Sequence, residues 1–173
     1  MIRSPETLAA SMTARTIDRL IFGFFYLLIG AVILWFGFRM INHAWEVRFF
    51  KDYLLHWEVS LEDFKVHQGI WPVFSGGNHA TYMEGLMAQF SRAGAAPPRS
   101  NTSRAYRYLI DGLWREKEDI FVLVLQDRLL LYGISFETLK YLDRAVDGRN
   151  DLDHGRIRGW KGKNKTTYIG QWQ

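Results

Sequence analysis

The stretch LIFGFFYLLIGAVILWFGF, Leu20 to Phe38, decides the architecture of this chain. It contains 19 residues without a charge, and about 20 apolar residues in a helix are enough to cross the hydrocarbon core of a bilayer. No proline interrupts the sequence between Glu6 and Pro72. We therefore expect a polar tail over residues 1–15 and a transmembrane helix over residues 16–42.

Three glycines recur every seven residues inside this segment, at Gly23, Gly30 and Gly37. Because 3.6 residues make one helical turn, they fall on nearly one face, where another helix backbone could approach closely. Glycine is also simply more frequent in membrane helices, so the spacing leaves both explanations open. Bulky aromatic side chains occupy other positions of the segment and are expected to face lipid or neighbouring helices: Phe22, Phe24, Phe25, Trp35 and Phe36.

After Arg39 the segment becomes amphipathic. Its apolar residues step alternately by three and four, which places them on one narrow helical face: Val47, Phe50, Leu54, Trp57, Leu61 and Phe64. Charged residues fill the positions between them. We expect the helix to continue over residues 43–68, to contact a soluble domain through this face, and to end near Gly69, because Trp71-Pro72 favours an extended backbone.

The remaining sequence predicts a second helix and a loop within residues 69–103, and an antiparallel sheet within residues 104–173. Ser75-Gly76-Gly77-Asn78 precedes the second helix, His79 to Arg92. Ser135 can cap a short helix within residues 136–146. The expected strands are Ala105 to Ile110, Ile120 to Leu125, Leu129 to Tyr132, Arg156 to Trp160 and Thr166 to Trp172. The predicted fold class is α+β, a long N-terminal helix packed on a small antiparallel sheet.

Composition limits the possible functions. The 173 residues carry a net charge of +4 and no cysteine, which excludes disulfides and thiolate metal sites. The basic residues flanking the apolar segment are balanced, Arg3, Arg15 and Arg19 before it against Arg39, Arg48 and Lys51 after it. The commoner arrangement for such an uncleaved anchor is a short tail inside and the domain exported. We therefore expect a single-pass protein of a bacterial inner membrane with an extracytoplasmic domain.

A transmembrane helix continued by an amphipathic helix, then a loop region and an antiparallel sheet, resembles type IV pilins and type II secretion pseudopilins. A second likeness is the succession Leu130-Leu131-Tyr132-Gly133-Ile134, Leu142-Asp143, Asp147-Gly148 and Gly155. Two features depart from the family. Leu28 stands where a glutamate should follow the Gly23-Phe24 pair, and the cysteine pair of many pilins is missing. The resemblance implies a structural subunit of a pilus or secretion machine.

Residues that could bind a metal or an anion each have a simpler explanation. His43 and Glu46 lie one helical turn apart but lack matching ligands from other helices. The oxygen-rich cluster Asp143, Asp147, Asn150, Asp151 and Asp153 could bind calcium, although the EF-hand order is not met; capping of local backbone amides is the alternative. The amides after Ser75-Gly76-Gly77-Asn78 could hold an anion or could simply be capped.

The basic C-terminal segment carries Trp160, Tyr168 and Trp172. Basic charge interleaved with aromatic residues suits nucleic acid or acidic lipid headgroups, whereas packing of the aromatic rings on the sheet is the alternative. We expect no nucleic-acid partner, because the net charge is small and the chain is tethered to a membrane.

These patterns together predict a non-enzymatic, membrane-anchored subunit without metal or cofactor. Its partners would be the lipid bilayer and other membrane-protein subunits, contacted through the apolar helix and the soluble domain. The alternative is an accessory subunit that stabilises a larger membrane complex, for example a respiratory or transport complex. An enzyme is the third possibility, for which the sequence offers no Ser-His-Asp or paired-carboxylate arrangement.

Overall fold

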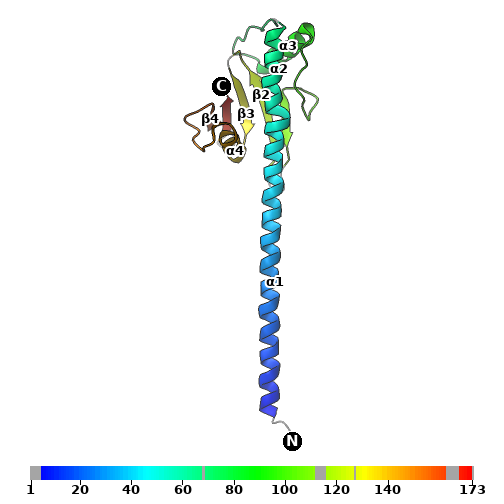
Figure 1. The fold of residues 1–173 in the computed structure, drawn as a ribbon, viewed down its shortest axis with the longest axis vertical. Helices are drawn as coiled ribbons and strands as arrows, with labels where there is room; N and C mark the ends of the chain where they lie inside the picture. The colour runs from blue at the N-terminus through cyan, green and yellow to red at the C-terminus, as the bar shows by residue number, and fades with distance from the viewer. Residues whose placement is uncertain (1–4, 68, 112–115, 127, 163–167, 173) are drawn as a thin grey trace. The chain divides into compact units, whose positions relative to one another are not determined.

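The computed structural model describes residues 5–172 apart from 68, 112–115, 127 and 163–167, with side chains from residue 16 onward (Figure 1). The chain divides into two compact units, Met1–Ile41 and Asn42–Gln173. We describe each by itself and refer to the second unit as the head.

The helix α1, Pro5–Arg48, supplies the whole described part of the first unit. It begins well before Thr16, so the tail expected over residues 1–15 is corrected from residue 5 onward. Proline is tolerated in the first helical turn, where its missing N–H has no partner to lose, and Leu8, Ala9 and Ala10 after it are strong helix formers. The polar character of residues 5–15 is therefore compatible with a helix.

Helical structure continues through the π-helix η1, Phe49–Leu54, into α2, Leu55–Val66. At its end the N–H of His67 bonds to the carbonyl of Asp63, and the N–H of Gly69 bonds to that of Phe64. A helix ending here was expected from Trp71-Pro72. The regular 3.6-residue repeat predicted for this region is wrong at Phe49–Leu54, because a π turn inserts one residue and shifts the buried face.

Five strands form one antiparallel sheet in the order β1-β2-β3-β5-β4, which confirms the α+β class and the long-helix-plus-sheet layout. The strands are β1 Arg107–Ile110, β2 Glu118–Val124, β3 Leu129–Ile134, β4 Ile157–Lys161 and β5 Tyr168–Trp172. Some predicted positions lie outside the described residues: Asp127 in the turn expected at Gln126-Asp127-Arg128, Lys163 and Asn164 in the turn expected at Gly162-Lys163-Asn164, and the first two residues of the strand expected from Thr166 to Trp172.

Two further helices belong to the head. In α3, His79–Ala93, the Asn78 side chain accepts hydrogen bonds from the N–H groups of Ala80 and Thr81. In α4, Phe136–Asp147, the Ser135 hydroxyl accepts one from the N–H of Thr138. Both helices were predicted, because a capping residue stands directly before an apolar repeat in each.

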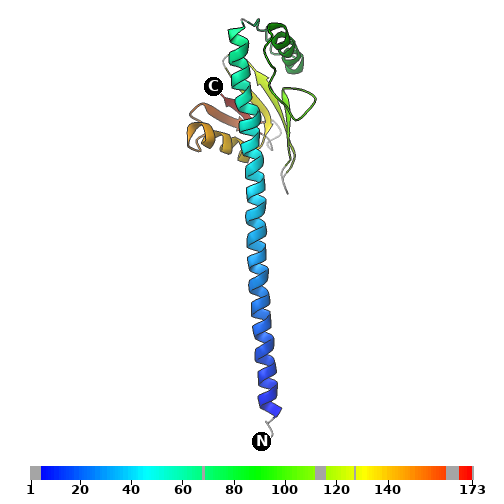
Figure 2. The same ribbon diagram turned by 45° about the vertical axis from the view of Figure 1, so that its right-hand side comes forward.

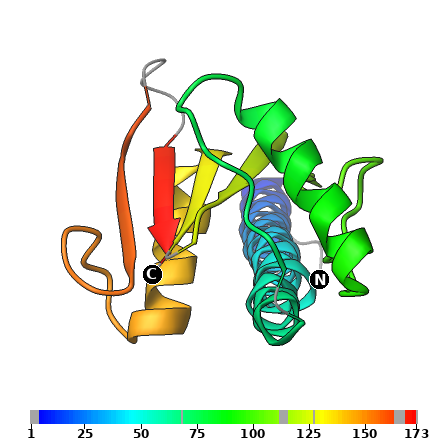
Figure 3. The same ribbon diagram turned by 90° about the horizontal axis from the view of Figure 1, so that it is seen from above.

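One face of the sheet carries α2 and α4 (Figure 3). Val122, Leu131 and Gly170 are cross-strand neighbours on this face. A Cβ placed on Gly170 would lie 2.9 Å from Leu139 of α4, so the missing side chain is what lets α4 approach. The helix α3 lies beside the far end of α2 (Figure 2). There Phe64 of α2 stacks on Phe90 of α3 with ring centroids 4.5 Å apart. The core therefore lies between the sheet and the helices.

Candidate functional site

Within the first unit, the apolar segment predicted to span a membrane is a helix with outward-facing side chains. Leu27 is 76% exposed and Phe22 is 63% exposed. Of the residues that the structure describes, the helical run Thr16–Val66 is the one long and apolar enough to cross a membrane by length and composition. Exposed apolar surface of this extent is unfavourable in water and favourable in lipid. This segment is the first candidate functional surface.

The three predicted helix-packing glycines lie on this surface. A Cβ added to Gly23, Gly30 or Gly37 would meet no described atom within 4 Å, so the space beside each is open. Because each glycine lacks a side chain, a neighbouring helix could bring its backbone against this face. Close packing of another helix on this face would therefore meet no described side chain at the three glycines.

Aromatic and arginine side chains mark the end of the apolar segment. The rings of Trp35 and Phe36 meet edge to face, with centroids 5.0 Å apart, and the guanidinium of Arg39 lies 5.6 Å from the Trp35 ring. Tryptophan and arginine side chains are typical of the boundary between hydrocarbon and headgroups.

The residues predicted to attach the helix to the soluble domain separate into two groups. Leu54, Trp57 and Phe64 are fully buried in the core. Phe50, Leu61 and Val47 are only half-buried. Phe49 takes the buried position that the regular repeat assigned to Phe50. Its side chain is 1% exposed, and its ring centroid lies 5.7 Å from that of Tyr108. Phe49 and Leu54 are five residues apart, the spacing of a π turn, but the four-residue step from Phe50 to Leu54 hides this in the sequence.

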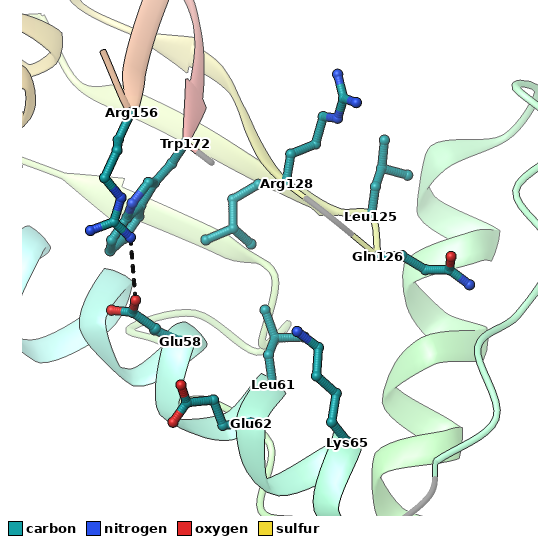
Figure 4. Close-up of a pocket in the computed structure, with 10 residues that line it drawn as sticks. Glu58, Leu61, Glu62, Lys65, Leu125, Gln126, Arg128, Arg156 and Trp172 are labelled. Carbon is teal, nitrogen blue, oxygen red and sulfur yellow. Dashed lines mark hydrogen bonds and ion pairs between the residues drawn. The ribbon is translucent and has the colours of Figure 1, made fainter.

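A groove of about 210 Å³ runs between α2 and the sheet (Figure 4). Arg156 pairs with Glu58 at 3.4 Å, and its guanidinium lies 5.9 Å from the Trp172 ring. The lining mixes leucines with side chains of both charges: Glu58, Leu61, Glu62, Lys65, Leu125, Gln126, Arg128, Leu129, Arg156 and Trp172. Leucine side chains and charged groups of both signs are therefore presented together in this groove.

The acidic loop after α4 uses its carboxylates to bind backbone amides. Asp147 accepts the N–H groups of Arg156 and Ile157 at 3.1 and 2.8 Å. Asp143 accepts the N–H of Asp151 at 2.6 Å, and Asp151 accepts that of Asp153. In these hydrogen bonds the carboxylates cap local backbone amides, which was the expected alternative to calcium binding.

Two of these carboxyl groups have shifted pKa values of opposite sign. Burial raises the pKa of Asp143, and the charge of Asp147 adds to this, against the opposing hydrogen bond from the Asp151 N–H. Burial also acts to raise the pKa of Asp147, but the N–H groups of Ile157 and Arg156 outweigh it and lower that pKa. Asp143 Oδ1 is buried without a hydrogen-bond partner among the described atoms.

The histidines are distributed over the head. His43 lies 3.9 Å from Glu46, His67 pairs with Asp63, and His154 pairs with Asp151. His56 is exposed, and His79 lies among aromatic rings, 5.6 Å from Tyr132. Across the described parts of the chain, no three His, Asp or Glu side chains are grouped so that they could hold a metal ion.

The other predicted binding elements have structural roles. The Asn78 side chain occupies the first free amides of α3, which were the candidate anion site. In the C-terminal hairpin Trp172 is buried and Tyr168 is half-buried, while Trp160 remains 46% exposed. Lys163 and Lys165 lie outside the described residues.

Sequence reasoning missed how the sheet edges are closed. The Asn101 amide pairs with both the N–H and the carbonyl of Leu109 on the outer side of β1, at 3.0 and 2.6 Å. On β4, the outward N–H of Ile157 bonds to Asp147, and that of Gly159 bonds to the carbonyl of Leu152. Isolated polar loop residues carry no periodic signal, so this role was visible only in the fold.

No family model matches the chain, and no curated protein or solved structure matches it either.

Proposed function

We propose that this chain is a non-enzymatic, single-pass membrane subunit with a pilin-like head, which serves in an assembly of a pilus- or secretion-type machine. The observation that carries the proposal is the first unit: an apolar helix with exposed side chains and an open glycine face. Such a surface is suited to contact with lipid and with other helices, whereas in a soluble monomer its apolar side chains would be exposed to water.

The head supports the same proposal through its closed sheet edges. The Asn101 amide on β1 and the Asp147 carboxylate on β4 occupy backbone groups that another strand would need. Capped edges disfavour assembly by strand addition. Partners would then contact the head through side-chain surfaces such as the groove beside Glu58 and Trp172, while the apolar helix packs in the bilayer.

An accessory subunit of a larger membrane complex, such as a respiratory or transport complex, is the second candidate. The observation that favours it is Leu28, which replaces the glutamate of the pilin motif after Gly23-Phe24. In both cases the domain would lie outside the cytoplasm on a bacterial inner membrane.

The experiment is an affinity purification of the full chain in mild detergent with identification of co-purifying proteins. Components of a filament or secretion platform support the first proposal; redox or transport subunits support the second. Gly30→Leu should strongly reduce partner recovery, because the added side chain fills the open face. Val32→Leu is the matched control, because it adds bulk roughly 200° around the helix. Equal recovery from both variants would refute helix packing through the glycine face.

A further inference from the structure

The face of the sheet opposite α2 and α4 presents aromatic and polar side chains toward its β4 edge. Side chains alternate along each strand, so the residues on this face are those between the ones that point to the helices. Trp160 is 46% exposed, and the others are half-buried or exposed. We call this set the outer face; on β3, β5 and β4 it consists of Leu130, Tyr132, Ile169, Gln171, Arg158 and Trp160.

The helix α3 covers the neighbouring part of the same sheet face, over β2. The ring centroid of His79, its first residue, lies 5.6 Å from that of Tyr132 and 6.5 Å from that of Phe121 on β2. The side chains of Arg158 and Trp160, two strands beyond Tyr132, remain exposed to solvent. The outer face is therefore accessible at β4 and bordered by α3 at β2.

Three residues of the outer face form a row across the strands. Tyr132 is the cross-strand neighbour of Ile169, and Ile169 is the neighbour of Trp160. Neighbouring strands lie about 4.8 Å apart, so the backbones that carry the two aromatic side chains are separated by about 10 Å. In the next row Gln171 is the neighbour of Arg158, which places an amide and a guanidinium beside the aromatic row.

The charge of these strands is positive. Together β3, β5 and β4 contain two charged residues, Arg158 and Lys161, and both are basic and exposed. Counting the stretch between the end of α4 and β4 leaves the sign unchanged, with three acids against four bases: Asp147, Asp151 and Asp153 against Arg149, Arg156, Arg158 and Lys161. Charge complementarity therefore favours a negatively charged ligand.

Aromatic rings with planar polar groups beside them suit a sugar chain. The C–H groups of a sugar ring pack on the electron-rich face of an aromatic ring, while its hydroxyl and carboxylate groups accept hydrogen bonds from amides and guanidinium groups. In a β-1,4-linked glycan every second sugar presents the same face, at a repeat close to the spacing of Tyr132 and Trp160. Two cations are few for following a phosphate backbone, which disfavours a nucleic acid.

We infer that the outer face binds an acidic β-1,4-linked glycan, with sugar rings packed on Tyr132 and Trp160 and a carboxylate held by Arg158. Ile169 would lie under the sugar between the two aromatic rings, and the Gln171 amide would bond to sugar hydroxyl groups. The contact would hold the head on a polysaccharide, in addition to its proposed contacts with other subunits, and does not depend on the proposed membrane span.

The test is a calorimetric titration of the full chain in phosphatidylcholine nanodiscs, with empty nanodiscs as the blank. The probe is the β-1,4-linked hexamer of mannuronate. The α-1,4-linked hexamer of guluronate is the control with the same charge and a different shape, and β-1,4-linked mannohexaose is the control without charge. The mannuronate hexamer should bind about tenfold more tightly than either control, because it alone supplies both the carboxylates and the extended repeat.

Three variants assign the contacts. Trp160→Ala should weaken mannuronate binding by about tenfold, because it removes a stacking surface. Arg158→Gln should lower the affinity for mannuronate to that for mannohexaose and leave the latter unchanged. Leu109→Ala shortens an exposed apolar side chain on β1, on the same sheet face, and should bind normally as the matched control. Unfolding midpoints establish that each variant is folded.

A folded chain that does not bind mannuronate, or that binds guluronate equally well, would overturn the inference. Unchanged binding by Trp160→Ala, or tighter binding of a thymidine hexanucleotide, would do the same. If mannuronate does not bind and Trp160→Ala instead loses co-purifying proteins, the outer face is a protein interface and the inference is wrong. Each of these outcomes leaves the membrane span untouched, since the span is tested through Gly30.

Discussion

The indole N–H of Trp57 donates a 2.8 Å hydrogen bond to the hydroxyl of Tyr108, which joins α2 to β1 inside the core. Trp57 and Tyr108 are both 0% exposed. The Tyr108 hydroxyl in turn donates to the carbonyl of Ala105 at 2.8 Å and lies 3.1 Å from that of Arg99. Burial raises the pKa of Tyr108, so it stays a neutral donor throughout the physiological range.

Tyr108→Phe should lower the free energy of unfolding by about 1–3 kcal/mol, because it leaves the buried Trp57 N–H and the Ala105 carbonyl without their partner. The measurement is thermal or denaturant unfolding of the full chain in detergent. Tyr53→Phe is the matched control, since Tyr53 packs its ring 5.1 Å from Tyr108 but is only half-buried. Equal effects of the two substitutions would show that the hydrogen bond does not stabilise the head.

The position of the π turn gives a prediction opposite to the regular helical repeat. Phe49→Ala should cost about 3–5 kcal/mol of stability, the range for a large buried side chain, and Phe50→Ala clearly less. Phe49 is 1% exposed, whereas Phe50 is half-buried against Trp172. Unfolding of the two variants under the same conditions decides the register. A larger effect at Phe50 would instead support the regular 3.6-residue repeat that the sequence predicted.

Much of the fold could be predicted because its signals are local and periodic. The strands at Ile120 and Leu129 are apolar runs separated by polar residues, and α4 begins directly after a capping serine. The register error at Phe49 arose because a π turn has no consensus sequence that a 3.6-residue repeat can detect.

The candidate surfaces were only partly predictable. The glycine face follows from spacing alone, since Gly23, Gly30 and Gly37 share one helix. The contact between His43 and Tyr141 joins residues distant in sequence and depends on how α4 packs. No single-sequence pattern indicates such a pair, so the contact was visible only in the fold.

Asn101→Ala should open the outer edge of β1. The change removes both hydrogen bonds to Leu109, lowers stability by roughly 1 kcal/mol, and leaves strand groups free for another chain. The measurement is the rate of aggregation on mild heating, followed by light scattering, together with the unfolding midpoint. Ser91→Ala on α3 is the control. Aggregation no faster than that of the control would show that the edge is protected by other means.

Gly159→Ala should destabilise the contact between α4 and the sheet by about 1–3 kcal/mol, because the new methyl group overlaps the buried Leu139 side chain. A double-mutant cycle with Leu139→Ala tests the cause. The methyl group then fills part of the space that Leu139 leaves, so the combined cost should be smaller than the sum of the two single costs. Additive costs would mean that α4 does not pack on Gly159.

Asp143→Asn should make the head more stable at neutral pH, by an amount on the order of 1 kcal/mol. The asparagine carbonyl can still accept the N–H of Asp151, and its amide can donate toward Asp147, where Oδ1 of Asp143 has no partner among the described atoms. The substitution also removes a buried negative charge beside that of Asp147.

The pH dependence gives the sign of the effect. Because the pKa of Asp143 is raised in the fold, the folded state binds more protons than the unfolded state between the ordinary aspartate pKa and the raised value. Stability of the natural chain should therefore rise as pH falls from neutral through the raised pKa, until the loss of the Asp147 carboxylate at lower pH reverses the trend. The Asp143→Asn variant should lack the rise and keep the reversal.

Melting temperatures of both chains across this pH range, with and without added Ca²⁺, provide the measurement. A variant less stable at every pH, or a natural chain that Ca²⁺ stabilises, would show instead that the Asp143 carboxylate is needed as an ion ligand.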